Sequence, residues 1–77
     1  MHYSHVLIRR ATIADGDALS RLAALDSART PKGQVLIAEV ADQPHAAIDI
    51  DSGKVIADPF RRTDHLVELL SVSARGV

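Results

Sequence analysis

The chain of 77 residues contains no cysteine, which excludes disulfide bonds, thiolate nucleophiles and cysteine-ligated zinc. It has one Phe, one Tyr and no Trp, so large aromatic side chains add little to its core. Nine basic and ten acidic side chains leave a formal net charge of -1. No aromatic side chains are interleaved with Lys or Arg, and we therefore expect no nucleic-acid partner.

Long apolar runs are missing as well. The longest strongly apolar run, Val35–Ala38, is far too short to cross a membrane. The first residues lack the basic and apolar regions of a secretory signal. We therefore expect a cytoplasmic protein with no membrane partner.

Apolar residues nonetheless make up 47% of the chain, which is typical of a folded protein rather than a disordered one. The length predicts a single domain over residues 1–77. A core of this size rarely supplies more than about 3–5 kcal/mol. We therefore expect association with a second copy or a partner to complete it.

Six segments have the apolar periodicity of strands or helices. In chain order they predict a strand at 6–10, a helix from 12 to about 28, strands at 35–40, 45–51 and 54–58, and a helix that Thr63 caps and that runs to Arg75. This order, β-α-β-β-β-α, predicts an α+β fold with a mainly antiparallel sheet and two helices.

Local patterns add detail to this prediction. Thr12 stands three residues before Asp15, which is typical of a helix start. In residues 35–40 the positions that face either side of a strand are apolar, which predicts a central strand covered on both faces. Residues 42–44 predict a turn. In the last helix one face collects the residues Leu66, Leu69, Leu70 and Ser73.

One acidic residue falls on the apolar face of the first helix. That face collects the residues Ala18, Leu19, Leu22, Ala23 and Leu25. Asp26 shares it, and a buried carboxylate needs a partner. Arg9 or Arg10 on the first strand can supply one, and hydrogen bonds to the loop at 27–30 are the structural interpretation. The functional alternative is a general base with a raised pKa.

Three short segments of the sequence are informative through their order and spacing. They are Ile8–Thr12 followed by Asp15 and Leu19, Ile37–Asp42 followed by Ala46 and Ala47, and Val55–Pro59. Together they resemble the N-terminal half of the GNAT superfamily of acyl-CoA-dependent N-acetyltransferases, over residues 6 to 75. The resemblance implies a fourth strand that leads into a cofactor loop.

The cofactor loop departs from the family pattern. In the GNAT family this turn reads Arg/Gln-x-x-Gly-x-Gly/Ala and wraps the pyrophosphate of acetyl-CoA. The resemblance aligns it with residues 62–67, where Arg62 matches but His65 and Val67 replace the two small residues. Their side chains hold the backbone N–H groups away from phosphates, and Asp64 adds a negative charge. We therefore expect no cofactor.

The resemblance also implies later strands that complete the acceptor site and the pantetheine groove. This sequence ends after the second long helix, so we expect the fourth strand, Lys54–Asp58, to have an unpaired edge. Exposed edges invite pairing. A homodimer joined through this edge is the expected partner arrangement.

The same turn is the main candidate site. Arg61, Arg62 and Thr63, with Asp64 and His65, stand at the start of a helix, where a phosphate or carboxylate can bind. The alternative interpretation is a solvated turn with an ordinary Thr cap.

Other polar residues give weaker patterns. Asp49 and Asp51 project from one strand face, with Glu39 as a possible neighbour across the hairpin, which suits acid–base work or Mg²⁺ as well as a solvated face. His2 and His5 face opposite ways in an extended segment. We therefore expect no metal site, and the catalytic residues stay unknown.

These observations lead to three functional hypotheses. The first is a GNAT-like half-domain that is inactive alone and acts as a dimeric interaction module. The second is an acetyl-CoA-dependent N-acetyltransferase that dimerisation completes. The third is a sensor that binds a small anion at the Arg61–Thr63 turn.

Overall fold

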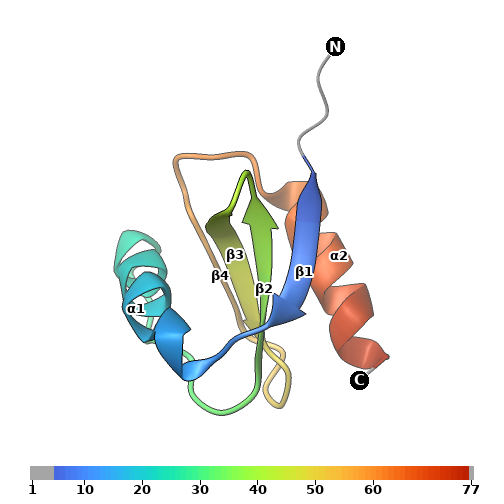
Figure 1. Ribbon diagram of the computed structural model, residues 1–77, viewed down its shortest axis with the longest axis horizontal. Coiled ribbons are helices and arrows are strands. Elements are labelled where there is room, and N and C mark those ends of the chain that lie inside the picture. Colours follow the sequence, from blue (N-terminus) through green and yellow to red (C-terminus); the bar gives the residue numbers. More distant parts are fainter. Residues whose placement is uncertain (1–4, 77) are drawn as a thin grey trace.

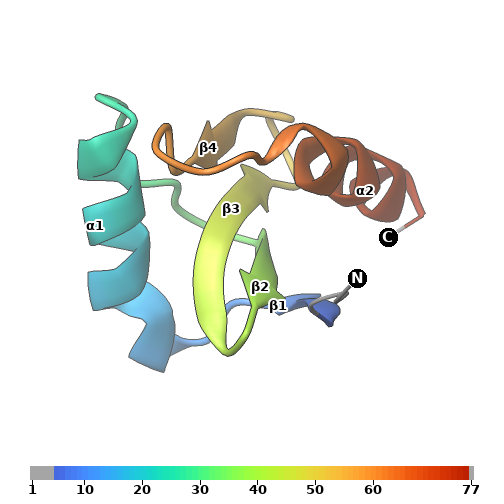
Figure 2. The same cartoon turned by 90° about the horizontal axis from the view of Figure 1, so that it is seen from above.

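The computed structural model describes residues 5–76. A four-stranded antiparallel sheet carries one helix on each face (Figures 1 and 2). Its elements are β1 (Val6–Arg10), a 3₁₀ turn (Ile13–Asp15), α1 (Gly16–Leu25), β2 (Val35–Val40), β3 (Gln43–Asp49), β4 (Val55–Ala57) and α2 (Asp64–Arg75). The strands are ordered β1-β2-β3-β4 in the sheet. The predicted α+β class and the order β-α-β-β-β-α are confirmed.

The central strand β2 is covered on both faces, as its sequence predicted. Val35 and Ile37 pack on the side of α1, against its buried leucine Leu22. Leu36 and Ala38 pack on the other side, against the leucines of α2. Two small apolar clusters therefore replace one large core, and the sheet separates them.

The turn between β2 and β3 is shorter than predicted. Ala41 and Asp42 have positive φ angles of 52° and 66°, which is typical of a two-residue hairpin turn. The strand β3 therefore begins at Gln43, and Pro44 lies inside it rather than in the turn. Pro44 is tolerated because the pairing of β2 and β3 is irregular at Glu39, its partner.

The helix α1 ends three residues earlier than predicted. Ser27 adopts a positive φ of 51°. Its N–H and that of Ala28 donate back to the carbonyls of Ala24 and Ala23, at 3.2 and 2.8 Å. This is a Schellman motif with serine in the place that glycine usually takes. The stop was invisible to periodicity because the residues after Leu25 are compatible with a helix.

The helix α2 spans the predicted residues but is turned slightly from the predicted face. Leu66 and Leu70 are buried against the sheet, whereas Leu69 is 45% exposed and Val72 is 59% exposed. The expectation that Leu69 faces the core is therefore wrong. Among residues 5–76 no helix has the length and apolar character needed to cross a membrane.

An ion cluster joins β1, β2 and the start of α1. The Arg9 guanidinium donates to both carboxylate oxygens of Asp15 at 2.8 and 2.9 Å, and to Glu39 at 3.0 Å. Asp15 is only 8% exposed, and it also accepts a hydrogen bond from the Thr12 backbone N–H at 2.6 Å. The hydrogen bonds from Arg9, and then that from Thr12, hold the pKa of Asp15 well below its ordinary value.

This cluster predicts a specific loss of stability. Asp15→Asn removes one charge of a largely buried pair, so it should lower the free energy of unfolding by about 2–3 kcal/mol. The control Glu68→Gln removes the same charge from an exposed site on α2 and should change it by less than about 0.5 kcal/mol. Urea unfolding at neutral pH measures both.

The pH dependence has a definite sign. The pKa of Asp15 is lowered on folding, so its stabilisation is present above its ordinary value of 3.8 and is lost as the pH falls below it. If Asp15→Asn and Glu68→Gln lowered the free energy of unfolding equally, the ion cluster would contribute no more than an exposed charge.

Candidate functional site

The residues predicted to form an anion site at the start of α2 do not converge. Arg62, Asp64 and His65 are exposed, whereas Thr63 is buried. Arg61 turns away from them towards Asp58, and its Nε donates to Asp58 Oδ2 at 3.2 Å. Of the five predicted residues, only Arg61 lines a cleft, which lies between α1, the start of β3 and the loop that follows β4.

Thr63 occupies the N-cap position, as predicted, but its side chain makes no capping hydrogen bond. Its backbone carbonyl accepts the Val67 N–H at 2.8 Å. The interpretation of this turn as an ordinary Thr cap is therefore right about the position and wrong about the hydrogen bond. Anion binding at this helix start stays a prediction.

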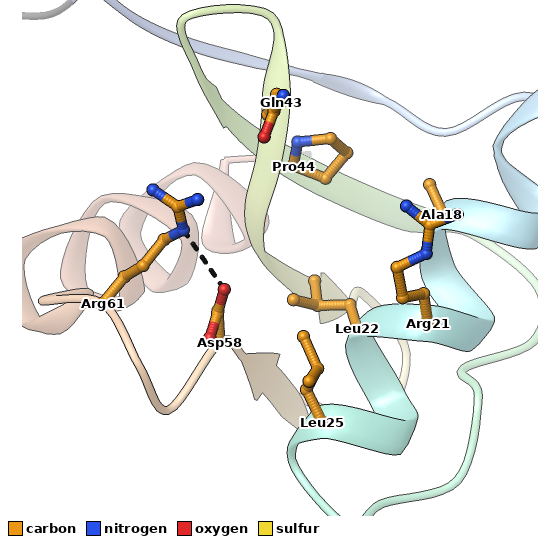
Figure 3. A pocket seen from close by; sticks show the side chains of 8 residues that line it. All are labelled: Ala18, Arg21, Leu22, Leu25, Gln43, Pro44, Asp58 and Arg61. Carbon is orange, nitrogen blue, oxygen red and sulfur yellow. Dashed lines mark hydrogen bonds and ion pairs between the residues drawn. The ribbon is translucent and has the colours of Figure 1, made fainter.

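Asp58 organises the loop that leads from β4 to α2. Its backbone N–H donates to the His45 carbonyl at 2.9 Å, which fixes the loop to β3. Its side chain accepts hydrogen bonds from the Phe60 backbone N–H at 2.9 Å and from Arg61. An Asp followed by Pro is typical of such turns. The turn directs the Arg61 side chain towards the hairpin of β2 and β3 (Figure 3).

The Arg61 side chain borders a cleft of about 360 Å³ between α1, the start of β3 and this loop (Figure 3). Its walls are formed by Ala18, Arg21, Leu22, Leu25, Gln43, Pro44, Asp58 and Arg61. Leu22 and Leu25 reach from α1 towards Asp58 (Figure 3). The cleft thus combines an apolar floor with two guanidinium groups and one carboxylate.

Sequence reasoning missed Arg21, because it lies outside the apolar face of α1. At 100° per residue, however, Arg21 borders Leu25 and Ala18 on that helix. A basic residue at the rim of an apolar face was the available signal. The contribution of β3 could not be foreseen while Gln43 and Pro44 were assigned to a turn.

The charges around the cleft affect a nearby histidine. His45 is half-buried on β3, and its backbone is bonded to Asp58. Burial lowers the pKa of His45 below its ordinary value of 6.5, the Arg61 charge lowers it further, and Asp58 opposes them. The charges of Asp58 and Arg61 in this loop therefore interact electrostatically with His45 on β3.

Asp49 and Glu39 have structural partners, and Asp51 lies in the turn after β3 rather than on the strand face predicted for it. Asp49 Oδ1 accepts the backbone N–H groups of Asp51 and Ser52 at 2.9 and 3.1 Å, which closes the turn after β3. Asp49 lies opposite Val35 rather than Glu39. The expectation that Glu39 faces this pair is therefore wrong, and Glu39 binds Arg9 instead.

No metal centre is found in the part of the chain that the structure describes. Residues 5–76 contain no group of three or more His, Asp or Glu side chains placed to share an ion. His5 is exposed, and His2 lies outside the described residues.

Asp26 is exposed rather than buried on the apolar face of α1. It pairs with neither Arg9 nor Arg10, so that prediction is wrong, and its hydrogen bond does not go to the 27–30 loop either. Its Oδ2 accepts the Ala57 backbone N–H at 3.1 Å. Because α1 ends at Leu25, Asp26 lies beyond the helix and faces the outer edge of β4.

The outer strands β1 and β4 each direct some backbone N–H and C=O groups away from the sheet. The Ala11 N–H bonds to the Val35 carbonyl, and alternation along an antiparallel pair then directs the backbone groups of Val6, Ile8 and Arg10 outwards. By the same rule β4 directs those of Val55 and Ala57 outwards.

No protein-family model matches this chain, and comparison with curated proteins and with solved structures finds no significant match. Its function must therefore be inferred from its own residues and their geometry.

The coupling of His45 to the loop can be measured. His45 should titrate below pH 6.5, and Arg61→Gln should raise its pKa because a neighbouring positive charge is removed. Arg62→Gln removes an exposed charge from the next position and should leave the titration unchanged. Two-dimensional NMR of the histidine ring gives all three curves.

The effect on stability has the matching sign. The pKa of His45 is lower in the folded chain, so its stabilisation is present above pH 6.5 and is lost as the pH falls through the folded value. An unchanged pKa of His45 in Arg61→Gln would contradict the coupling.

Proposed function

We propose that the chain is a GNAT-like half-domain that acts as a homodimeric interaction module and has no acetyltransferase activity of its own. The order β-α-β-β-β-α is the order that the resemblance to the GNAT family implies. The observation that carries the proposal is the open outer edge of the sheet at β1.

The edge of β1 is the better of the two for pairing with another chain. It belongs to a strand of five residues. By the alternation of the ladder, the N–H and C=O groups of Val6 and Ile8 and the N–H of Arg10 point away from β2. The Arg10 carbonyl accepts a hydrogen bond from the Arg9 side chain at 3.1 Å. An edge of this kind is a template for an added strand.

The edge of β4, which the sequence favoured, is less open. The strand has three residues, Val55–Ala57, and one of its two outward N–H groups is already bonded to Asp26. We therefore assign the dimer contact to β1 rather than to Lys54–Asp58. Association there also covers Val6 and Leu7, which are 36% and 54% exposed.

The start of α2 is poorly suited to acetyl-CoA. A pyrophosphate needs close backbone N–H groups and no competing charge. Asp64 introduces a carboxylate in the first turn of α2, and the neighbouring His65 and Val67 carry side chains where the family has small residues. These features favour a binding role over catalysis.

Matched proline variants test the dimer contact. Proline removes an N–H, and at an outward position it leaves the internal ladder intact. Val6→Pro should raise the dimer dissociation constant at least tenfold, whereas Val55→Pro on β4 should leave it unchanged. Analytical ultracentrifugation over a range of concentrations should show twice the 8.3 kDa chain mass for the unaltered protein. The reverse pattern would assign the contact to β4, and a monomer at all concentrations would refute the module.

Acetyl-CoA binding tests the absence of catalysis. Two-dimensional NMR with millimolar acetyl-CoA should show no shifts clustered at residues 59–67. If blocked backbone approach is the main defect, the double variant His65→Gly, Val67→Gly should bind more tightly than the unaltered chain. Clustered shifts, followed by release of CoA with an amine acceptor, would instead favour an acetyltransferase completed by dimerisation.

A further inference from the structure

We infer that the cleft between α1, the start of β3 and the Asp58–Arg61 loop binds a small monocarboxylic acid with a short apolar chain. The inference does not depend on the dimer contact, because no residue of β1 lines the cleft. This cleft is a different place from the helix start at Thr63, and of the residues predicted for that helix start only Arg61 lines it.

The positive charge of the cleft comes from two different elements. Arg21 projects from α1, and among residues 5–76 its guanidinium makes no ion pair and no hydrogen bond. Arg61 uses only its Nε to bind Asp58, which leaves its two terminal nitrogens for a ligand. A guanidinium presents paired N–H groups that match the two oxygens of a carboxylate.

Asp58 acts as a positioning residue for this arrangement. Its side chain is 15% exposed and holds Arg61 through Nε, while the Phe60 N–H fixes the carboxylate itself. The guanidinium is therefore restrained before any ligand arrives, which reduces the entropy lost on binding.

The floor of the cleft selects an apolar body. Leu22 and Leu25 of α1 and Pro44 of β3 line it. Its volume of about 360 Å³ corresponds to about twelve water molecules at roughly 30 Å³ each. A chain of five or six carbons fits that space and can cover the two leucines.

The charge balance favours a single negative charge on the ligand. Arg21 and Arg61 supply two positive charges, and the Asp58 carboxylate on the same wall subtracts one. A doubly charged phosphate would meet repulsion from Asp58 and would leave the leucines uncovered. The carboxylate with an apolar tail uses both features of the cleft.

Hexanoate is a suitable probe, with hexanol and inorganic phosphate as its two controls. Two-dimensional NMR of the full chain should show shifts at residues 18–25, 43–44 and 58–61, which saturate with a dissociation constant of the order of 1 mM. Hexanol, which lacks the charge, and phosphate, which lacks the apolar chain, should each bind at least tenfold more weakly.

Three glutamine variants test which charges matter. Arg21→Gln and Arg61→Gln should each weaken hexanoate binding about tenfold. Arg62→Gln is the matched control, because Arg62 is exposed and does not line the cleft. Since the Arg21 side chain pairs with no other side chain among residues 5–76, its replacement keeps the test valid if Arg61→Gln perturbs the loop.

The outcomes are distinct. Equal binding of phosphate and hexanoate would overturn the assignment of an apolar carboxylate. Equal loss in all three glutamine variants, or no loss at Arg21 and Arg61, would overturn the cleft as the site. Binding that survives in Val6→Pro would show that the cleft works independently of the β1 contact.

Discussion

The Arg9 guanidinium is the contact on which the arrangement of this small domain depends. It joins β1 to β2 through Glu39 and to the first turn before α1 through Asp15. Asp15 in turn holds the Thr12 N–H, so the chain leaves β1 and enters α1 at a fixed angle. The helix is thereby laid across one face of the sheet, with Leu22 against it. The cleft lies along α1, from Ala18 to Leu25, so its position depends on this anchor.

A sheet with a helix on each face divides the apolar residues of a short chain into two clusters. Small residues make this possible, because Ala38, Ala46 and Ala47 are fully buried in the strands and let the helices approach closely. Each cluster contains only a few large side chains, so neither can be large. The sheet has only four strands, so β1 and β4 form its two outer edges.

Much of the fold could be predicted from the sequence, because the strands and helices have strong periodicity. β2 is apolar on both alternations and is buried on both faces, as predicted. The errors occur where local backbone geometry decides. Ser27 stops α1 with a positive φ, and Ala41 with Asp42 makes a tight turn without glycine. Because the end of α1 was not foreseen, Asp26 was predicted to lie on the apolar face of that helix. Because the hairpin turn was not foreseen, Pro44 was predicted to lie in the turn rather than in β3.

The candidate site was harder to predict because it is assembled from three separate segments. Arg61 was identified, but its assumed neighbours, Arg62 and Thr63, turn elsewhere once Asp58 has fixed the loop. Its true counterpart, Arg21, lies forty residues earlier in the chain, and only the packing of α1 brings the two arginines to one cleft. The helix α1 therefore begins at the Asp15 anchor and also carries Arg21 on the wall of the cleft. Asp15 itself does not line the cleft, so a change at Asp15 reaches it only through the start of α1.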